Sequence, residues 1–268
     1  MALQLPLFPV DQPVPEERQI GRKSSIDALE RRLLGVSHQW MIGERRIGKT
    51  SVAQAVLARM RNLGAVVLDV DLTKLGMITS DNLASEIVGQ ARAAGVSTPV
   101  DEGERNGLDK ALSEIAAHAR RIERHSYFLL DEVQLLARIP DADRHVARWC
   151  RESDSPIVFV FTGSEEAAVR DLREAGKPLA AVGSEFVLPD ISPEDWLPAL
   201  RDRFEEGAVQ ISDRELEAIV AAAGGHPRRT MFIAAGVYAR AAAQLDRVAS
   251  STLVELGIKE AERDRSWR

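Results

Sequence analysis

Short, almost continuous apolar runs recur along the first two thirds of the chain and alternate with amphipathic segments. Four runs predict buried strands and a weaker fifth follows, at residues 38–42, 65–72, 127–130, 157–161 and 185–188. Continuous apolar runs are typical of parallel strands that are covered on both faces. Helical periodicity lies between them, as at 82–93, 108–121 and 144–152. The alternation predicts an α/β fold with a doubly wound, parallel, five-stranded sheet, whose ligands bind at the carboxyl ends of its strands.

From residue 189 onward the pattern changes to helical periodicity without a clear strand. Helices are predicted over 194–205, 213–223 and 228–243. In the second of them Leu216, Ile219, Val220 and Ala223 form the i, i+3, i+4, i+7 stripe of a packed helix. We therefore expect an N-terminal arm (1–19), an α/β core (20–189) and an all-helical lid domain (190–268).

The segment that follows the first predicted strand reads GERRIGKTS. It fits G-x-x-x-x-G-K-[ST] between a strand and a helix, which is the pattern of a phosphate-binding loop, or P-loop. The N–H groups of such a loop and the positive end of the following helix face the phosphates. The residues expected to bind nucleotide here are Gly43, Glu44, Arg45, Arg46, Ile47, Gly48, Lys49, Thr50 and Ser51.

Individual side chains of this loop have different expected roles. Lys49 should reach the β- and γ-phosphates of ATP, and the Thr50 hydroxyl should be a ligand of Mg²⁺. Arg45 and Arg46 are compatible with solvated side chains and equally with contacts to a partner subunit or nucleic acid.

A second motif, YFLLDEVQLL, places Asp131 and Glu132 at the carboxyl end of the third predicted strand. We expect Asp131 to hold Mg²⁺ and Glu132 to orient and polarise the attacking water. A carboxylate placed for water favours hydrolysis over transfer to a substrate hydroxyl. The next strand ends in Thr162-Gly163-Ser164, where either hydroxyl could sense the γ-phosphate; for Ser164 a helix cap is the alternative.

Composition narrows the class of protein further. The chain has 268 residues, a net charge of −6 and a pI near 5.5, which argues against a surface that coats nucleic acid, although a local DNA contact stays open. No apolar run approaches the ~18 residues of a membrane span. The N-terminus lacks the pattern of a signal peptide and Cys150 is the only cysteine, so we expect a cytoplasmic protein that does not contact a membrane.

With these motifs in hand, the chain resembles archaeal-type ATPases of the STAND/AAA+ group, P-loop proteins related to origin-recognition initiator ATPases. The resemblance covers residues 18–250 and rests on the segments IGR (20–22), GERRIGKTS, LLDEVQLL, FTGS and GGHPR (224–228). It implies that Gly21 and Arg22 lie near the adenine. It also implies that the turn at Pro227 contacts the nucleotide from the lid, and that Arg228, or alternatively Arg229, reaches the γ-phosphate.

For Arg22 and the turn at Pro227, a structural role is the alternative to contact with the nucleotide. Arg22 is also compatible with a capping or ion-paired surface arginine, and the turn at Pro227 with an ordinary helix start that leaves both following arginines in solvent. Gln134 completes the DExQ pattern of the resembled family, with no role that the sequence defines.

Two departures from the resembled family bear on activity. Relatives often carry an arginine shortly before the last core strand, where it acts across a subunit interface; here that segment reads PLAAVG (178–183), and Arg170 and Arg173 are the substitutes. Relatives also tend to continue into a winged-helix domain, which we expect to be missing or supplied by another chain.

The leading hypothesis is a Mg²⁺-dependent, ATP-hydrolysing switch that acts on a partner protein, a second copy of the chain or DNA. Two alternatives remain: a module that holds nucleotide with little turnover, and a P-loop kinase for a small molecule. The Asp131-Glu132 pair argues against the first, and the lack of a recognisable acceptor pocket in the sequence argues against the second.

Overall fold

The computed structural model describes residues 6–98 and 107–264, and the chain divides into two compact units. The sheet unit contains Ser25–Arg45 and Lys49–Leu188, and the helical unit contains Met1–Ser24, Arg46–Gly48 and Pro189–Arg268. Residues 1–5 of the predicted arm and 265–268 of the predicted lid lie outside the described residues. The predicted arm, core and lid assign a function to each part of the chain, and this assignment stays a prediction.

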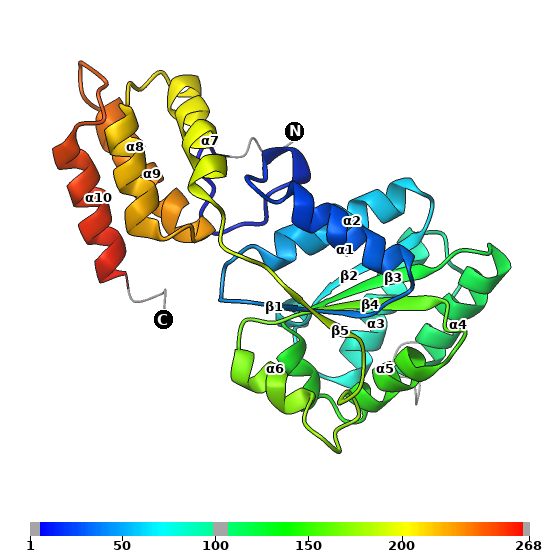
Figure 1. Ribbon diagram of the computed structural model, residues 1–268. Helices are drawn as coiled ribbons and strands as arrows, with labels where there is room; N and C mark the ends of the chain where they lie inside the picture. Colours follow the sequence, from blue (N-terminus) through cyan, green and yellow to red (C-terminus); the bar gives the residue numbers. More distant parts are fainter. Residues whose placement is uncertain (1–5, 99–106, 265–268) are drawn as a thin grey trace. The chain divides into compact units, whose positions relative to one another are not determined.

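The sheet unit is built on a parallel sheet with the strand order β2-β3-β4-β1-β5 (Figure 1). The register places Asp71, at the end of β2, opposite Asp131, at the end of β3. The predicted five-stranded parallel fold is confirmed. The strands are β1 (Gln39–Ile42), β2 (Val66–Asp71), β3 (Ser126–Asp131), β4 (Ile157–Thr162) and β5 (Ser184–Val187).

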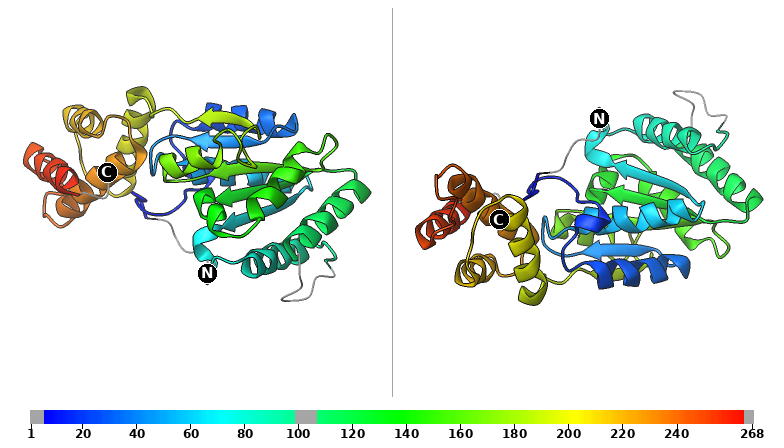
Figure 2. Two further views of the ribbon diagram at one scale, coloured as in Figure 1. Left: turned by 90° about the horizontal axis from the view of Figure 1, so that it is seen from below. Right: turned by 90° about the horizontal axis from the view of Figure 1, so that it is seen from above.

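Helices cover both faces of this sheet. In Figure 1 α1 (Lys23–Leu34) and α2 (Lys49–Asn62) lie on one face, and the two views of Figure 2 look onto the opposite layers. The chain runs from β1 to the far edge at β2 and then returns through β3 and β4, so right-handed crossovers place the helices after β1 and after β2 on opposite faces. The second face carries α3 (Ser80–Ala93), α4 (Gly107–Arg121), α5 (Ala142–Arg151) and α6 (Glu166–Leu172). Two short 3₁₀ helices, η2 (Leu72–Lys74) and η3 (Val133–Arg138), follow β2 and β3.

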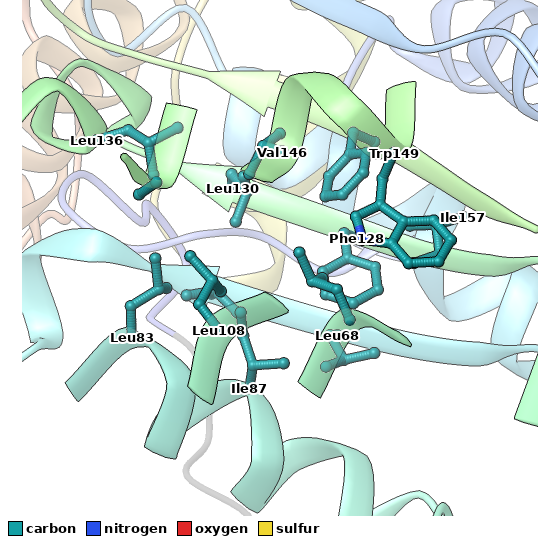
Figure 3. Packing of buried hydrophobic residues seen from close by; sticks show 14 of the residues in the cluster. Leu68, Leu83, Ile87, Leu108, Phe128, Leu130, Leu136, Val146, Trp149 and Ile157 are labelled. Atoms are coloured by element: carbon teal, nitrogen blue, oxygen red, sulfur yellow. The ribbon is translucent and has the colours of Figure 1, made fainter. Parts of the chain in front are cut away.

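The apolar runs of the strands form the core between these layers. Phe128 and Leu130 of β3 are buried in one cluster with Ile87 of α3 and Leu108 of α4 (Figure 3). Burial on both faces explains why the strands are apolar at consecutive positions. The strands are thereby held in a rigid frame, which fixes the polar residues that follow them at the carboxyl edge.

In its described residues, the helical unit packs the helices α7–α10 around its own core. Serine side chains cap two of the helices: Ser192 accepts from the Asp195 N–H, and Ser212 from the Glu215 N–H. Phe8, from the N-terminal segment, is buried in this core with its ring centre 5.0 Å from that of Phe204. The elements are η1 (Glu16–Arg18), α7 (Pro193–Glu206), α8 (Asp213–Ala223), α9 (Pro227–Ala242) and α10 (Ser251–Arg263).

Over residues 6–98 and 107–264, each helix is too short or too polar to cross a membrane.

Candidate nucleotide site

The P-loop connects β1 to α2, which begins at Lys49. Three of its residues have positive φ: Gly43 (146°), Arg46 (64°) and Gly48 (102°). Two of them are glycines, which adopt this conformation at little cost, so the backbone curls as a phosphate cradle requires. Glu44, Arg45 and Arg46 are exposed residues, although the Arg46 side chain is only 33% exposed, whereas Ile47 is buried.

Lys49 closes the loop from the helix side. Its Nζ donates to the carbonyl oxygens of Gly43 and Glu44, both at 2.8 Å, and the residue is 7% exposed. Burial lowers the pKa of Lys49, and nearby carboxylates, that of Glu132 first among them, act in the opposite direction by favouring the cation. The sheet unit therefore holds a positive charge at the first turn of α2, where the backbone N–H groups also favour an anion.

Asp131 joins three elements at the carboxyl edge of the sheet. Thr50 Oγ1, on α2, donates to Asp131 Oδ2 at 2.9 Å. Thr162, at the end of β4, donates through its buried hydroxyl to Asp131 Oδ1. The Glu132 N–H donates to the same oxygen at 3.0 Å. The predicted metal ligands Thr50 and Asp131 are thus in direct contact, and Thr162 lies beside them.

Glu132 follows β3 in a left-handed backbone conformation, with φ 55° and ψ 44°. Its carboxylate accepts from the Ser164 hydroxyl at 2.7 Å, from the Ser164 N–H at 3.4 Å and from the Gln134 side-chain amide. A left-handed non-glycine residue is uncommon and is found where the surrounding structure enforces it. Here those contacts fix the carboxylate next to Asp131.

These contacts define roles that the sequence left open. Ser164 binds Glu132 rather than capping α6, whose N-cap is Glu165 without a side-chain cap hydrogen bond. Gln134 is buried and donates to Glu132, so it holds the loop after β3.

The remaining predicted contacts belong to the helical unit. Gly21 has φ 61°, and a Cβ there would lie 2.6 Å from Cγ2 of Ile191, so this position requires glycine. Arg22 is 3% exposed and donates to the carbonyl oxygens of Ile47 at 2.7 Å and Pro189 at 2.6 Å. Burial lowers its pKa to about 10. Arg22 is therefore a buried tie between backbone segments and not a surface arginine; its contact with adenine stays a prediction.

The GGHPR turn starts α9, with His226 as N-cap and Pro227 in the first turn. Arg228 is buried: its Nε donates to Asp11 Oδ1 at 2.9 Å, and Nη1 lies 3.7 Å from Asp264 Oδ2. The alternative in which both arginines of this turn lie in solvent is wrong for Arg228. Asp11 is a contact that sequence reasoning missed, because a single acidic residue in a proline-rich segment carries no recognisable signal.

The predicted residues thus fall into two groups. The sheet unit brings together Lys49, Thr50, Asp131, Glu132 and Thr162, while Ser51 continues α2. The helical unit holds Gly21, Arg22, Ile47, Gly48, Pro227 and Arg228.

The described part of the chain contains no group of three or more His, Cys, Asp or Glu side chains that could hold a metal ion by themselves. The Thr50–Asp131 pair nevertheless fits Mg²⁺, which is bound in nucleotide sites by one or two protein oxygens, with phosphates and water completing the shell.

Residues 38–170 match the family model of an AAA domain. The matched stretch runs from the start of β1 into α6 and contains the P-loop, Asp131, Glu132 and Thr162. A search of the curated proteins found no match.

Solved structures share the fold over most of the chain. The Walker-type ATPase of Pyrococcus abyssi is 20% identical with a TM-score of 0.72, and 97% of this chain aligns with 80% of that one. The ORC2 protein of Aeropyrum pernix, solved as ADPNP-ADP complexes, is 20% identical with a TM-score of 0.69, covering 95% of this chain and 71% of that one. The RuvB Holliday junction branch migration motor of Thermotoga maritima is 14% identical with a TM-score of 0.58, covering 95% and 72%.

The AAA-domain match covers just under half of the chain, and the solved structures are similar to it in fold. At these identities the structural likeness concerns the fold alone. Assignment to the STAND group stays a prediction.

Proposed function

We propose that the chain binds ATP with Mg²⁺ and hydrolyses it, and that the nucleotide state switches its interaction with a partner. The observation that carries this proposal is the cluster around Asp131, which joins the P-loop helix through Thr50 to the end of β4 through Thr162. Such a cluster connects the residues expected to contact the phosphates with those expected to detect them.

Hydrolysis is the reaction that Glu132 supports. A carboxylate acts as a general base only when it is held within reach of the water it activates, and Ser164 and Gln134 hold Glu132 beside Asp131. A module that stores nucleotide needs no such carboxylate, and a kinase needs an acceptor site.

Lys49, Thr50 and Asp131 form the phosphate and metal part of the proposed site. Lys49 would bind the β- and γ-phosphates, and Thr50 and Asp131 would hold Mg²⁺. When bound, Mg²⁺ offsets negative charge on the phosphate oxygens. Thr162 would report the γ-phosphate through its hydrogen bond to Asp131.

The helical unit would supply the remaining contacts. Gly21 and Arg22 are proposed to lie near the adenine, and Pro227 and Arg228 to contact the nucleotide from the lid, with Arg228 on the γ-phosphate. An arginine that binds only the γ-phosphate separates ATP from ADP, and a switch requires such a difference in binding between its two states.

The partner is proposed to be a protein or a second copy of this chain. The net charge of −6 gives no general attraction for nucleic acid, although one similar solved structure, the ORC1 protein of Aeropyrum pernix, is described in complex with DNA.

The test is a steady-state phosphate-release assay of the full chain with Mg²⁺ and ATP, combined with mass analysis of the products after addition of a metabolite mixture. Release of free phosphate without a phosphorylated metabolite supports an ATPase. Tight binding without release supports the storage module, and a phosphorylated metabolite supports a kinase.

A further inference from the structure

The N-terminal segment forms a closed loop on the helical unit. Phe8 is 5% exposed, with its ring centre 5.0 Å from that of Phe204 and 5.3 Å from that of Tyr238. Arg203, on α7, donates to the carbonyl oxygen of Leu7 and, at 3.0 Å, to that of Arg18. One buried guanidinium therefore ties both ends of the segment Leu7–Arg18, which we call the arm loop, to the same helix.

Asp11 lies within this arm loop and reaches the buried arginine of the GGHPR turn. Its Oδ1 accepts from Arg228 Nε at 2.9 Å and lies 3.9 Å from Nη1 of Arg46 in the P-loop. The Arg228 side chain is 7% exposed, whereas that of Asp11 is 65% exposed. A buried guanidinium needs an anion, and an exposed carboxylate on a loop is an anion that can leave.

Of the two arginines that Asp11 approaches, Arg228 is the one for which the γ-phosphate is the expected anion, and Arg46 belongs to the P-loop. A carboxylate and a phosphate oxygen bind a guanidinium through the same N–H groups, so one Arg228 Nε cannot serve both. Asp264, with Oδ2 3.7 Å from Arg228 Nη1, lies against a different nitrogen of the guanidinium.

We propose that Asp11 is an autoinhibitory ligand of Arg228, which occupies the arginine in the nucleotide-free chain and must leave before the γ-phosphate of ATP can bind there. This inference rests on the proposed function. The conformation of the arm loop then depends on the bound nucleotide. With ADP the Asp11–Arg228 ion pair persists, whereas with ATP Asp11 is released while Phe8 stays buried in the helical core.

The direct test is the substitution Asp11→Asn, which keeps an acceptor oxygen for Arg228 and removes the negative charge. The matched control is Glu17→Gln, which removes a charge from an exposed residue of the same arm loop. Affinities for ATP and ADP are measured by titration of the full chain with fluorescent nucleotides.

We expect Asp11→Asn to bind ATP about two- to tenfold more tightly than the wild type; the gain is modest because the Asp11–Arg228 ion pair that ATP must break is partly exposed. The affinity for ADP should change less than about twofold. Glu17→Gln should change neither. In an Arg228→Gln background the effect of Asp11→Asn should disappear, since the competing arginine is gone.

Unchanged ATP affinity in Asp11→Asn, or equal tightening for ATP and ADP, overturns the inference. These outcomes are distinct from failure of the proposed function, in which the wild-type chain releases no phosphate from ATP. If neither the wild type nor Asp11→Asn binds nucleotide, both proposals fall.

Hydrogen exchange gives a readout that does not depend on affinity. The amides of the arm loop should exchange faster with a slowly hydrolysed ATP analogue than with ADP. Equal exchange in the two states contradicts release of Asp11.

Discussion

Asp131 accepts hydrogen bonds from side chains that are 81 and 31 residues away along the chain, Thr50 and Thr162. The sequence predicted the first of these neighbours, because Thr50 and Asp131 are each assigned to Mg²⁺ by their motifs. The contacts of Glu132 with Ser164 and Gln134 were not predictable, since they depend on its left-handed backbone and no motif encodes that conformation.

At this scale we predict that Lys49→Ala weakens binding of both ATP and ADP by roughly 10- to 100-fold, because each hydrogen bond to a charged group contributes about 1.5–3 kcal/mol. Fluorescent-nucleotide titration measures the loss. Lys177→Ala, which removes a half-exposed lysine from the sheet unit, is the control and should bind normally. Thermal unfolding of Lys49→Ala separates lost binding from lost folding, and normal nucleotide affinity in a folded Lys49→Ala would remove Lys49 from the site.

Elements were more predictable than individual contacts. Apolar runs identified all five strands to within one or two residues at most ends, because strands buried on both faces have little choice of side chain. Helix boundaries in polar segments were less accurate. The helix α5 begins at Ala142 rather than at the predicted residue 144, and the residue before it, Asp141, has a left-handed backbone conformation. Pairing of β1 between β4 and β5 follows from the parallel fold and not from any local pattern.

The turn from β4 to α6 is the element that places Ser164 against Glu132. A Cβ at Gly163 would lie 2.6 Å from Gln134 Oε1 and 2.6 Å from Val169 Cγ2. We predict that Gly163→Ala lowers the unfolding free energy by about 1–3 kcal/mol, as other overpacked sites do, and slows turnover because the contacts of Glu132 shift.

Chemical denaturation and phosphate release measure the two effects of Gly163→Ala. Gly89→Ala is the control: Gly89 is exposed on α3 with no neighbour to meet a Cβ, and alanine there should stabilise by about 0.5–1 kcal/mol. A Gly163→Ala protein as stable and active as the wild type contradicts the packing account.

A histidine directly before β1 is hydrogen-bonded to β4. His38 Nδ1 accepts from the Phe159 N–H at 3.0 Å, and its Nε2 donates to the Cys150 carbonyl at 3.2 Å, so the imidazole is neutral in this arrangement. Burial lowers the pKa of His38 below 6.5. The unfolded chain then binds a proton more readily than the folded one, and stability falls as the pH drops below about 6.5 towards the folded pKa.

We predict that His38→Gln, which retains a donor and an acceptor but does not titrate, reduces the loss of unfolding free energy between about pH 7.5 and pH 5. Urea denaturation of both proteins at the two pH values measures the difference. An identical loss in the two proteins would show that His38 does not contribute to acid sensitivity.

For the whole molecule, the sequence predicted the five-stranded parallel sheet that the structure has, whereas the division into arm, core and lid stays a prediction. The sequence did not predict that the segment before residue 20 packs with the helices after residue 189. That contact depends on Phe8, which packs against Phe204, and on Arg203, which donates to the Leu7 carbonyl 196 residues away; such distant pairing has no signature in local periodicity.

The structure also distinguishes the two arginines proposed to act across a subunit interface. Arg173 is ion-paired with Glu185 at 2.6 Å, lies 5.1 Å from the centre of the Trp40 ring, and has a side chain that is 20% exposed. The Arg170 side chain is 77% exposed. An arginine that acts on a neighbouring subunit must project from the surface, so Arg170 fits that role and Arg173 fits a structural one.

We predict that the dilute chain hydrolyses ATP below about 1 s⁻¹ and that the rate per chain rises with protein concentration, because an arginine supplied in trans contributes about 10³- to 10⁵-fold in related phosphoryl transfer. Arg170→Ala should abolish the rise. The control Arg144→Ala, which removes another exposed, ion-paired arginine, should retain it. A rate per chain that does not depend on concentration contradicts the proposal, and a rise that persists in Arg170→Ala contradicts the choice of Arg170.

The central claim is that this chain hydrolyses ATP through Glu132. The most direct measurement compares the wild type with Glu132→Gln for phosphate release at saturating Mg²⁺ and ATP, and for ATP affinity in the same preparations. We predict ATP affinities within about threefold of each other and a rate at least ~10²-fold lower in Glu132→Gln, because the amide keeps the shape of the side chain but cannot accept the proton of the attacking water. Equal phosphate release by the two proteins, or none from the wild type under conditions where it binds ATP, would contradict the claim.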